Sequence, residues 1–230
     1  MNMKLLLSPI ILFPSFSIAQ STESGPYIGL QGGGNWVSSQ YLKQQNINFV
    51  RMNFKEPTKS GYTLGIVSGW NLASGFRPEI ELSHRKNSLS SFDERHYEGN
   101  TAIEGLGSES FSGFFANLWY DIPINLQVSE KVNIKPYIGA GVGHGRLTIE
   151  NLKAGGVPFG ETFKDNVNAW QLGTGITMNY KRKYSASLNY RYVKTSSAEY
   201  KNNGLPLLPP DNIRTRYKAY TTALEMRYNF

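Results

Sequence analysis

The sequence predicts an all-β protein, an eight-stranded antiparallel up-and-down transmembrane β-barrel. Residues 220–230 alternate between an apolar, aromatic face and a polar one, and a period of two residues is that of a β-strand. Similar segments recur along the chain, joined in turn by short and long connections, as expected of a barrel with short turns at one rim and long loops at the other. Beyond residue 19 no apolar run reaches the roughly 18 residues that a membrane-spanning helix needs. Membrane crossing is therefore assigned to strands.

Two parts of the chain are predicted. Residues 1–19 combine a short basic start, an apolar run broken by Pro9 and Pro14, and small residues before Gln20, which is the pattern of a secretory signal peptide. Residues 20–230 are predicted to form the barrel domain. Cysteine is absent, so disulfides do not hold the exported chain together, and barrel closure and packing must do so.

The predicted strands are segments in which apolar side chains alternate with small or polar ones. They span residues 25–36, 61–72, 76–83, 111–122, 134–147, 170–180, 184–193 and 220–230. Shorter turns at 73–75, 123–131 and 181–183 follow the second, fourth and sixth strands. Residues 37–59 and 86–108 lose the alternation and are predicted to be long polar loops, like the connections after the fifth and seventh strands. With both termini on one side, all four long loops lie at the opposite rim.

Charged residues occur on the polar face of three predicted strands. The predicted polar network of the lumen consists of Arg77, Glu79, Glu81, Arg191, Glu225 and Arg227. Closing eight strands leaves an interior just wide enough for side chains to fill, and charges held there must be paired to offset the loss of water. We therefore expect an ion-paired plug, with glycines making room for large side chains from the opposite wall. A narrow pore for ions or small solutes is the alternative.

Four parts of the chain carry a family resemblance: Pro26-Tyr27-Ile28-Gly29, Arg77-Pro78-Glu79-Ile80-Glu81, the glycine-rich run from Pro136 to Gly143, and the terminal Phe230. They resemble the small outer-membrane β-barrel and surface-antigen superfamily, which includes the opacity proteins and the barrel domain of OmpA. The resemblance implies a Gram-negative outer-membrane protein whose final strand is recognised by the barrel-assembly machinery. The apolar face of that strand carries Leu224, Met226, Tyr228 and Phe230. Because the sequence ends there, we expect no peptidoglycan-binding domain like that of OmpA.

No catalytic, metal or cofactor site is predicted. The glycines between residues 139 and 145 recur at every second position and no helix is expected after them, which does not fit the dinucleotide-binding fingerprint. Three histidines without cysteine do not suggest a metal site. Some small barrels are lipid A hydrolases with a membrane-facing His–Ser–acid site, and His84 and His144 lie near the outer ends of predicted strands. Neither has a serine neighbour two residues away on its face, which argues against such a site. A lipid A-modifying enzyme is therefore only the second alternative.

Loops are the remaining candidates for a function, because function on a rigid scaffold concentrates there. The residues predicted to contact a ligand are Phe49, Arg51, Phe54, Leu205, Leu207 and Leu208. The leucines lie in a proline-stiffened segment that loses little freedom on binding. The formal net charge is +7, and the Lys and Arg residues that give rise to it are scattered along the chain. This distribution predicts no nucleic-acid site and fits the anionic lipopolysaccharide of an outer leaflet.

The expected function is therefore non-enzymatic. The barrel is expected to present four extracellular loops for adhesion or ligand contact, as in relatives that serve as adhesins and surface antigens, and to contribute to envelope integrity. The expected partners are outer-membrane lipids and lipopolysaccharide, the barrel-assembly machinery, and a host or environmental surface ligand, with no cofactor and no nucleic acid. A soluble periplasmic β-protein is the structural alternative.

Overall fold

A computed structural model provides the structure of the chain. It describes residues 24–38, 40–42, 50–54, 61–96, 99–124, 126–129, 132–154, 156–158, 162–181, 183–202 and 211–230. The predicted signal peptide lies outside these residues. The described residues include no helix long and apolar enough to cross a membrane.

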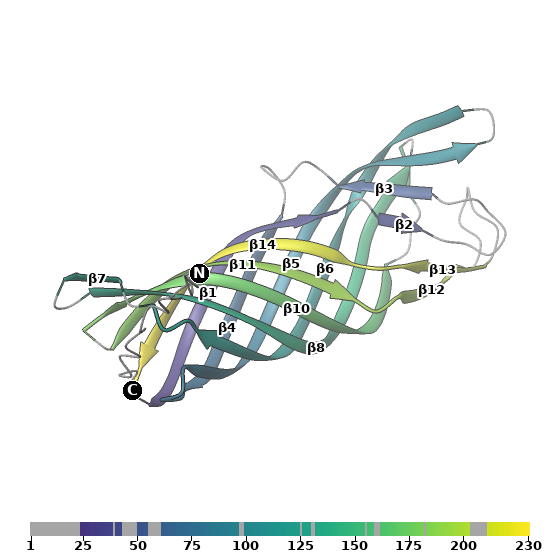
Figure 1. Cartoon of the computed structure of the whole chain (residues 1–230). Coiled ribbons are helices and arrows are strands. Elements are labelled where there is room, and N and C mark those ends of the chain that lie inside the picture. The colour runs from purple at the N-terminus through teal and green to yellow at the C-terminus, as the bar shows by residue number, and fades with distance from the viewer. Residues whose placement is uncertain are drawn as a thin grey trace, which may run out of the picture.

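Eight long strands form a closed barrel (Figure 1). They are β1 (Gly25–Val37), β4 (Tyr62–Asn71), β5 (Phe76–His96), β6 (Gly99–Asp121), β8 (Val132–Ala154), β10 (Phe163–Tyr180), β11 (Tyr184–Thr195) and β14 (Lys218–Asn229). Each pairs antiparallel with the next in this order. The ring closes because β14 also pairs with β1, from Tyr27 opposite Asn229 to Val37 opposite Ala219. The predicted fold class is confirmed.

Among the described residues, six short strands lie at the two ends of the barrel. They are β2 (Gln40–Leu42), β3 (Val50–Phe54), β7 (Leu126–Ser129), β9 (Val157–Pro158), β12 (Ala198–Asn202) and β13 (Asp211–Thr215). In Figure 1, β2, β3, β12 and β13 lie at the end away from the start of β1 and the end of β14, whereas β7 lies at the end where β1 starts and β14 ends. We call the first of these the outer end of the barrel and the second its inner end. The outer end therefore carries most of the structure beyond the barrel wall.

The prediction of a loop over residues 86–108 is wrong. β5 and β6 continue through this region as one hairpin, paired from Phe76 opposite Tyr120 to His96 opposite Gly99. The outward positions Lys86 and Ser88 are polar, so the apolar alternation that marks a strand in lipid disappears while the backbone pairing continues. The other predicted loops also contain strands: β2 and β3 lie within 37–59, and β10 begins at residue 163 instead of 170.

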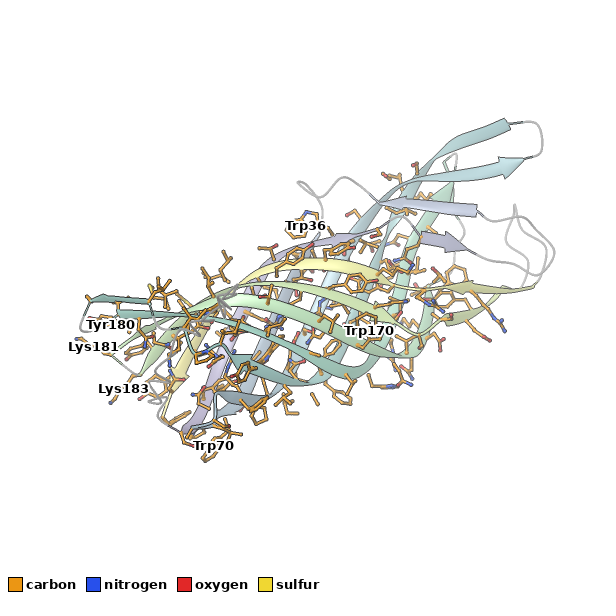
Figure 2. The ribbon with its side chains drawn as sticks, viewed as in Figure 1. Trp36, Trp70, Trp170, Tyr180, Lys181 and Lys183 are labelled. Atoms are coloured by element: carbon orange, nitrogen blue, oxygen red, sulfur yellow. The ribbon has the colours of Figure 1, made fainter. Side chains whose placement is uncertain are left out.

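The barrel is apolar outside and polar inside over its central part. Leu30 on β1 is 64% exposed and Met226 on β14 is 63% exposed, whereas the inward Gln31 and Glu225 are buried. This outward apolar belt is bordered by aromatic side chains, as in barrels that cross a lipid bilayer. In Figure 2, Trp70 and Tyr180 lie toward the inner end, and Trp36 and Trp170 lie nearer the outer end.

Inward glycines make room for aromatic rings. A Cβ atom on Gly175 of β10 would lie 2.7 Å from the Tyr137 ring, and one on Gly173 would lie 3.0 Å from the Trp119 ring. Tyr137 is the register partner of Gly175 on the neighbouring β8, and Trp119 lies one strand further, on β6. The rings therefore come from strands on the same side of the barrel, not from the opposite wall as the sequence suggested.

Replacing Gly175 by valine should destabilise the barrel by about 1–3 kcal/mol, because overpacking forces the Tyr137 ring out of its position. The matched control is Gly32→Val, since a Cβ atom there points to the outer face and meets its nearest atom, of Leu64, at an ordinary 3.4 Å. The free energy of unfolding in urea, followed by tryptophan fluorescence of the refolded protein in vesicles, compares the two. Equal effects of the two substitutions would contradict the assignment.

Candidate functional site

The lumen contains a network of ion pairs around Glu81. The Glu81 carboxylate accepts hydrogen bonds from Arg85 at 3.0 Å and from Arg191 at 2.6 Å. Arg191 also donates to Glu225 at 3.0 Å, and Glu225 pairs with Arg227 at 3.4 Å. These residues belong to β5, β11 and β14. The network therefore joins three strands of the wall across the lumen.

A second group surrounds the carboxylate of Glu79. The Tyr27 hydroxyl donates to it at 2.7 Å, and the indole nitrogen of Trp119 donates at 2.9 Å. Arg77 lies 3.7 Å from Glu79 and 3.5 Å from Asp121. Because Glu79 receives donors from β1 and β6 and pairs with a cation of its own strand, its charge is well compensated away from water.

Two amide side chains connect the groups around Glu79 and Glu81. The amide nitrogen of Asn117 lies 3.1 Å from a carboxylate oxygen of each. Gln171 donates to Glu81 at 2.8 Å and to the side-chain Oδ1 of Asn117 at 2.7 Å. Aromatic rings cover the cations: Arg77 lies 4.9 Å from the Tyr137 ring centroid, Arg191 lies 5.0 Å from that of Trp119, and Arg227 lies 5.1 Å from that of Tyr27. Side chains thus fill this level of the lumen.

The structure places all six side chains of the predicted lumen network inside the barrel, where they are buried and linked to one another by ion pairs or shared hydrogen-bond partners: Arg77, Glu79, Glu81, Arg191, Glu225 and Arg227. Sequence reasoning missed Arg85. The signal was present, because the inward series that runs through Glu81 and Ser83 at every second residue continues to Arg85. It was missed because the predicted strand ended at residue 83.

An apolar layer fills the lumen on the outer side of the charged network. Phe111, Phe115, Leu147, Val193 and Tyr217 are completely buried there and belong to one cluster. The Arg85 guanidinium lies 5.2 Å from the Phe115 ring centroid, so the charged and apolar layers are in contact. Two successive layers of different chemistry therefore fill the lumen.

A buried carboxyl group, Glu109, lies beyond Phe111 toward the outer end, outside the apolar belt. Its Oε2 accepts a hydrogen bond from Gln40 at 3.1 Å, and Gln40 in turn accepts one from Thr215 at 3.1 Å. Burial raises the pKa of Glu109 from 4.5 to about 8, against the lowering effect of the hydrogen bond from Gln40. The group is therefore mainly protonated at neutral pH.

On the outer surface, a histidine and a serine lie together where the apolar belt ends. His84 on β5 is the register partner of Ser112 on β6, and their Nδ1 and Oγ atoms are 2.7 Å apart. The search for a serine two residues from His84 along its own strand could not find Ser112, because this serine is a neighbour across the strand pair and not along the chain. Directly paired residues lie about 4.5–5.5 Å apart, closer than residues i and i+2 of one strand.

The surroundings of the two histidines do not complete a hydrolase site. Among the described residues, no carboxylate is hydrogen-bonded to the His84 ring, and His144 bonds to the Asn168 side-chain oxygen at 2.9 Å. The described residues also contain no group of three His, Cys, Asp or Glu side chains that could hold a metal ion. Among the described residues, the His84–Ser112 pair thus supplies two of the three residue types of a His–Ser–acid site.

The remaining predicted site residues are those of the assembly signal and those predicted to contact a ligand. The four residues of the predicted assembly signal all point outward and are exposed: Leu224, Met226, Tyr228 and Phe230. Arg51 and Phe54 belong to β3 at the outer end. Phe49, Leu205, Leu207 and Leu208 lie outside the described residues. The contact and assembly roles of these residues stay predictions.

Comparisons with known proteins place this geometry in a family. A family model described as an outer membrane protein beta-barrel domain matches residues 5–230, while a comparison with curated proteins found no match. Among solved structures, OprG from Pseudomonas aeruginosa is 15% identical with a TM-score of 0.49, covering 92% of this chain and 99% of that chain. Neisserial surface protein A is 13% identical with a TM-score of 0.45, and the match covers 91% of this chain and 100% of that chain. The protease OmpT from Escherichia coli is 7% identical with a TM-score of 0.45, and the match covers 90% of this chain and 97% of that chain. None is similar enough to assign a function.

Replacing Glu81 by glutamine should destabilise the barrel by about 3–5 kcal/mol, because it leaves the buried guanidinium groups of Arg85 and Arg191 without their counter-charge. The control is Glu199→Gln, which removes an exposed ion pair of 2.9 Å with Arg214 and should cost about 0–1 kcal/mol. Urea unfolding of both variants in vesicles measures the difference. A Glu81 variant as stable as the control would show that the buried network adds nothing.

Replacing Glu109 by glutamine should remove a pH dependence of stability. The folded-state pKa of about 8 lies above the ordinary value of 4.5, so the stability gained from holding the proton is complete below about pH 4.5 and is lost as the pH rises toward 8. Glutamine accepts the same hydrogen bond and does not titrate. Thermal midpoints in detergent, measured by circular dichroism, should therefore fall more steeply between pH 5 and pH 8 for the unsubstituted protein. Parallel curves for the two proteins would contradict the burial of this carboxyl.

Proposed function

The chain belongs to the family of outer membrane protein β-barrel domains, and from this premise we propose that it is a non-enzymatic surface protein of the bacterial outer membrane. In this proposal the barrel is a scaffold whose outer end contacts a ligand of a host or environmental surface and whose wall contributes to envelope integrity. Outer-membrane barrels keep short turns on the periplasmic side, which puts the outer end at the cell surface.

The extension of the wall beyond the apolar belt carries the proposal. A strand crosses a bilayer with about 9–11 residues, whereas β5 has 21 residues and β6 and β8 have 23 each. Roughly half of each of these strands is therefore left to stand outside the lipid. A wall that only had to close the membrane would not need this length, whereas a platform for contacts at the cell surface would.

The filled lumen supports a scaffold over a pore. An ion that crossed the barrel would first have to displace the ion pairs around Glu81 and then pass the apolar layer around Phe111 and Phe115, where it would lose its hydration without compensation. Both layers consist of buried side chains. Because both layers would obstruct an ion, this interior supports a scaffold rather than a pore.

The loop between β12 and β13 provides the sharpest test of ligand contact. Replacing residues 203–210 by a Gly-Ser linker of the same length keeps Asn202 opposite Asp211, the last described pair of the hairpin. We expect cells that express this variant to adhere to matrix proteins and host cells on the order of tenfold less than cells with the unsubstituted protein, which corresponds to the loss of about 1.4 kcal/mol of contact free energy.

A second variant, which is a further test because the replaced segment contains the predicted contact residue Phe49, carries a linker of equal length in place of residues 43–49, between β2 and β3. It preserves the pairing of Leu42 with Val50 and tests whether the effect belongs to one loop or to both. Protease added outside the cells confirms that the outer end is exposed. If the loops are cleaved and the unsubstituted protein confers no adherence, ligand contact by the loops is excluded for the surfaces tested, and conductance in planar bilayers tests the pore instead.

The second candidate function, a lipid A-modifying enzyme, is favoured by the 2.7 Å contact between His84 and Ser112 on the outer face. It lacks a carboxylate on the histidine among the described residues. Mass spectrometry of lipid A from cells with the unsubstituted protein, with Ser112→Ala and with no protein decides the matter. Loss of an acyl chain that depends on Ser112 would establish the enzyme.

A further inference from the structure

A shallow trough follows the outer face of β6 where the apolar belt ends. Its floor is formed by the small side chains of Ser110 and Ser112 on β6. On one side, Lys86 and His84 of β5 are their register partners, and on the other side Arg146 of β8 is the partner of Ser112. Strands lie about 4.8 Å apart, so the backbones of His84 and Arg146 are about 10 Å apart across the serine. Basic side chains therefore border both sides of a hydroxyl-lined floor.

The donors of this trough are only partly engaged by the protein. Arg146 is bonded through Nε to Asn166 at 3.4 Å, which leaves the two Nη groups that bind phosphate oxygens in parallel. His84 uses Nδ1 for Ser112, which leaves Nε2. Lys86 lies 4.0 Å from Glu150, and both side chains are more than a third exposed, so this pair holds Lys86 only loosely.

The trough continues into an apolar groove at the level of the lipid. One open groove of about 980 Å³ is lined by His84, Ser112 and Arg146 at its polar end. Its apolar lining consists of Leu30, Leu64, Ile66, Leu82 and Phe114. The His84 ring lies 5.9 Å from that of Tyr62, an aromatic side chain of the outer girdle, and such side chains sit at the headgroup level of a membrane. The groove therefore offers donors at headgroup level and apolar surface directly below.

We propose that this trough is a binding site for a phosphorylated glycolipid of the outer leaflet, with the chemistry of lipid A. Its phosphate lies over Ser112 between His84 and Arg146, and its acyl chains follow Leu82 and Phe114. Arg and Lys side chains recognise phosphate, and basic pockets on the side of membrane proteins bind lipid headgroups. The site is on the barrel wall, so it does not depend on the ligand contact proposed for the loops.

The two-part lining favours a lipid over a soluble anion. A free phosphate would gain only the contacts with the basic side chains, against the nearby carboxylate of Glu150 and in competition with water. A lipid adds the burial of its chains against Leu82 and Phe114, which are both about half exposed, and it is confined to the leaflet in which the groove lies. Charge and shape thus both select an anionic lipid.

The test compares two double variants of the full-length barrel in neutral detergent micelles. Lys86→Gln with Arg146→Gln removes two positive charges from the trough, and Lys181→Gln with Lys183→Gln removes two from the turn at the other rim, where Figure 2 places both lysines. Native mass spectrometry during titration with bisphosphorylated lipid A gives the dissociation constants. We expect the first variant to bind on the order of tenfold or more weakly, and the second to change less than about twofold.

Three further arms identify the ligand chemistry. Dephosphorylated lipid A should bind the unsubstituted protein as weakly as lipid A binds the Lys86→Gln, Arg146→Gln variant. Inorganic phosphate at millimolar concentration should not displace lipid A. Ser112→Leu, which fills the floor without a change of charge, should also weaken binding. Equal losses in the two double variants, or unchanged binding of dephosphorylated lipid A, would overturn the site. Equally strong binding of phosphatidylglycerol would overturn the assignment to a phosphorylated glycolipid. The different gel mobility of unheated and heated samples verifies that each variant is folded.

Discussion

The closure of β14 on β1 is the constraint on which the rest of the structure depends. Lipid offers no hydrogen bonds to an unpaired backbone, so a sheet that crosses a membrane must have no edge. Pairing from Tyr27 opposite Asn229 to Val37 opposite Ala219 satisfies this requirement. Closure with eight strands then fixes a narrow lumen, which side chains must fill without collision. The glycines at 173 and 175 follow from that width, because the rings of Trp119 and Tyr137 occupy the space that their side chains would take.

The ionic filling of the lumen is explained better by specificity than by stability. Buried ion pairs seldom add more stability than apolar side chains of the same volume. An apolar lumen, however, would give the central strands two apolar faces, and a shift of one residue in register would then carry little penalty. With Glu81 and Arg191 on one face and Leu82 and Tyr190 on the other, the same shift would move charges into lipid. The polar interior thus fixes which face turns outward, and the partners of Glu81 reduce the desolvation cost of this solution.

The sequence predicts the part of the structure that lies in lipid and fails where lipid no longer imposes an alternation. The series Arg77, Glu79, Glu81 indicated the lumen because apolar residues separate its members, whereas Arg85 lies among polar neighbours and was missed. The pairing of His84 with Ser112 could not be predicted for a different reason. It depends on the register of β5 against β6, and one strand's pattern gives the face of a residue but not its partner across the sheet. The loop candidates Leu205, Leu207 and Leu208 carry no periodic signal that either argument could use.

The unequal lengths of the barrel strands explain both the extension at the outer end and the trough on the lipid-facing surface. β4 spans 10 residues, close to the length that a bilayer requires, whereas its neighbour β5 spans 21. Past the belt, β5, β6 and β8 keep their register as far as Ser108 on β6, so their outward residues stay aligned in rows up to that level as they change from apolar to polar. The row that begins at Leu64 on β4 therefore passes through His84 and Ser112 and reaches Arg146 on β8. Strands that are longer than the bilayer is thick place one such row of outward residues at the level of the lipid headgroups. In this chain the row carries Ser112 between His84 and Arg146, which makes the surface that borders the lipid complementary to phosphate.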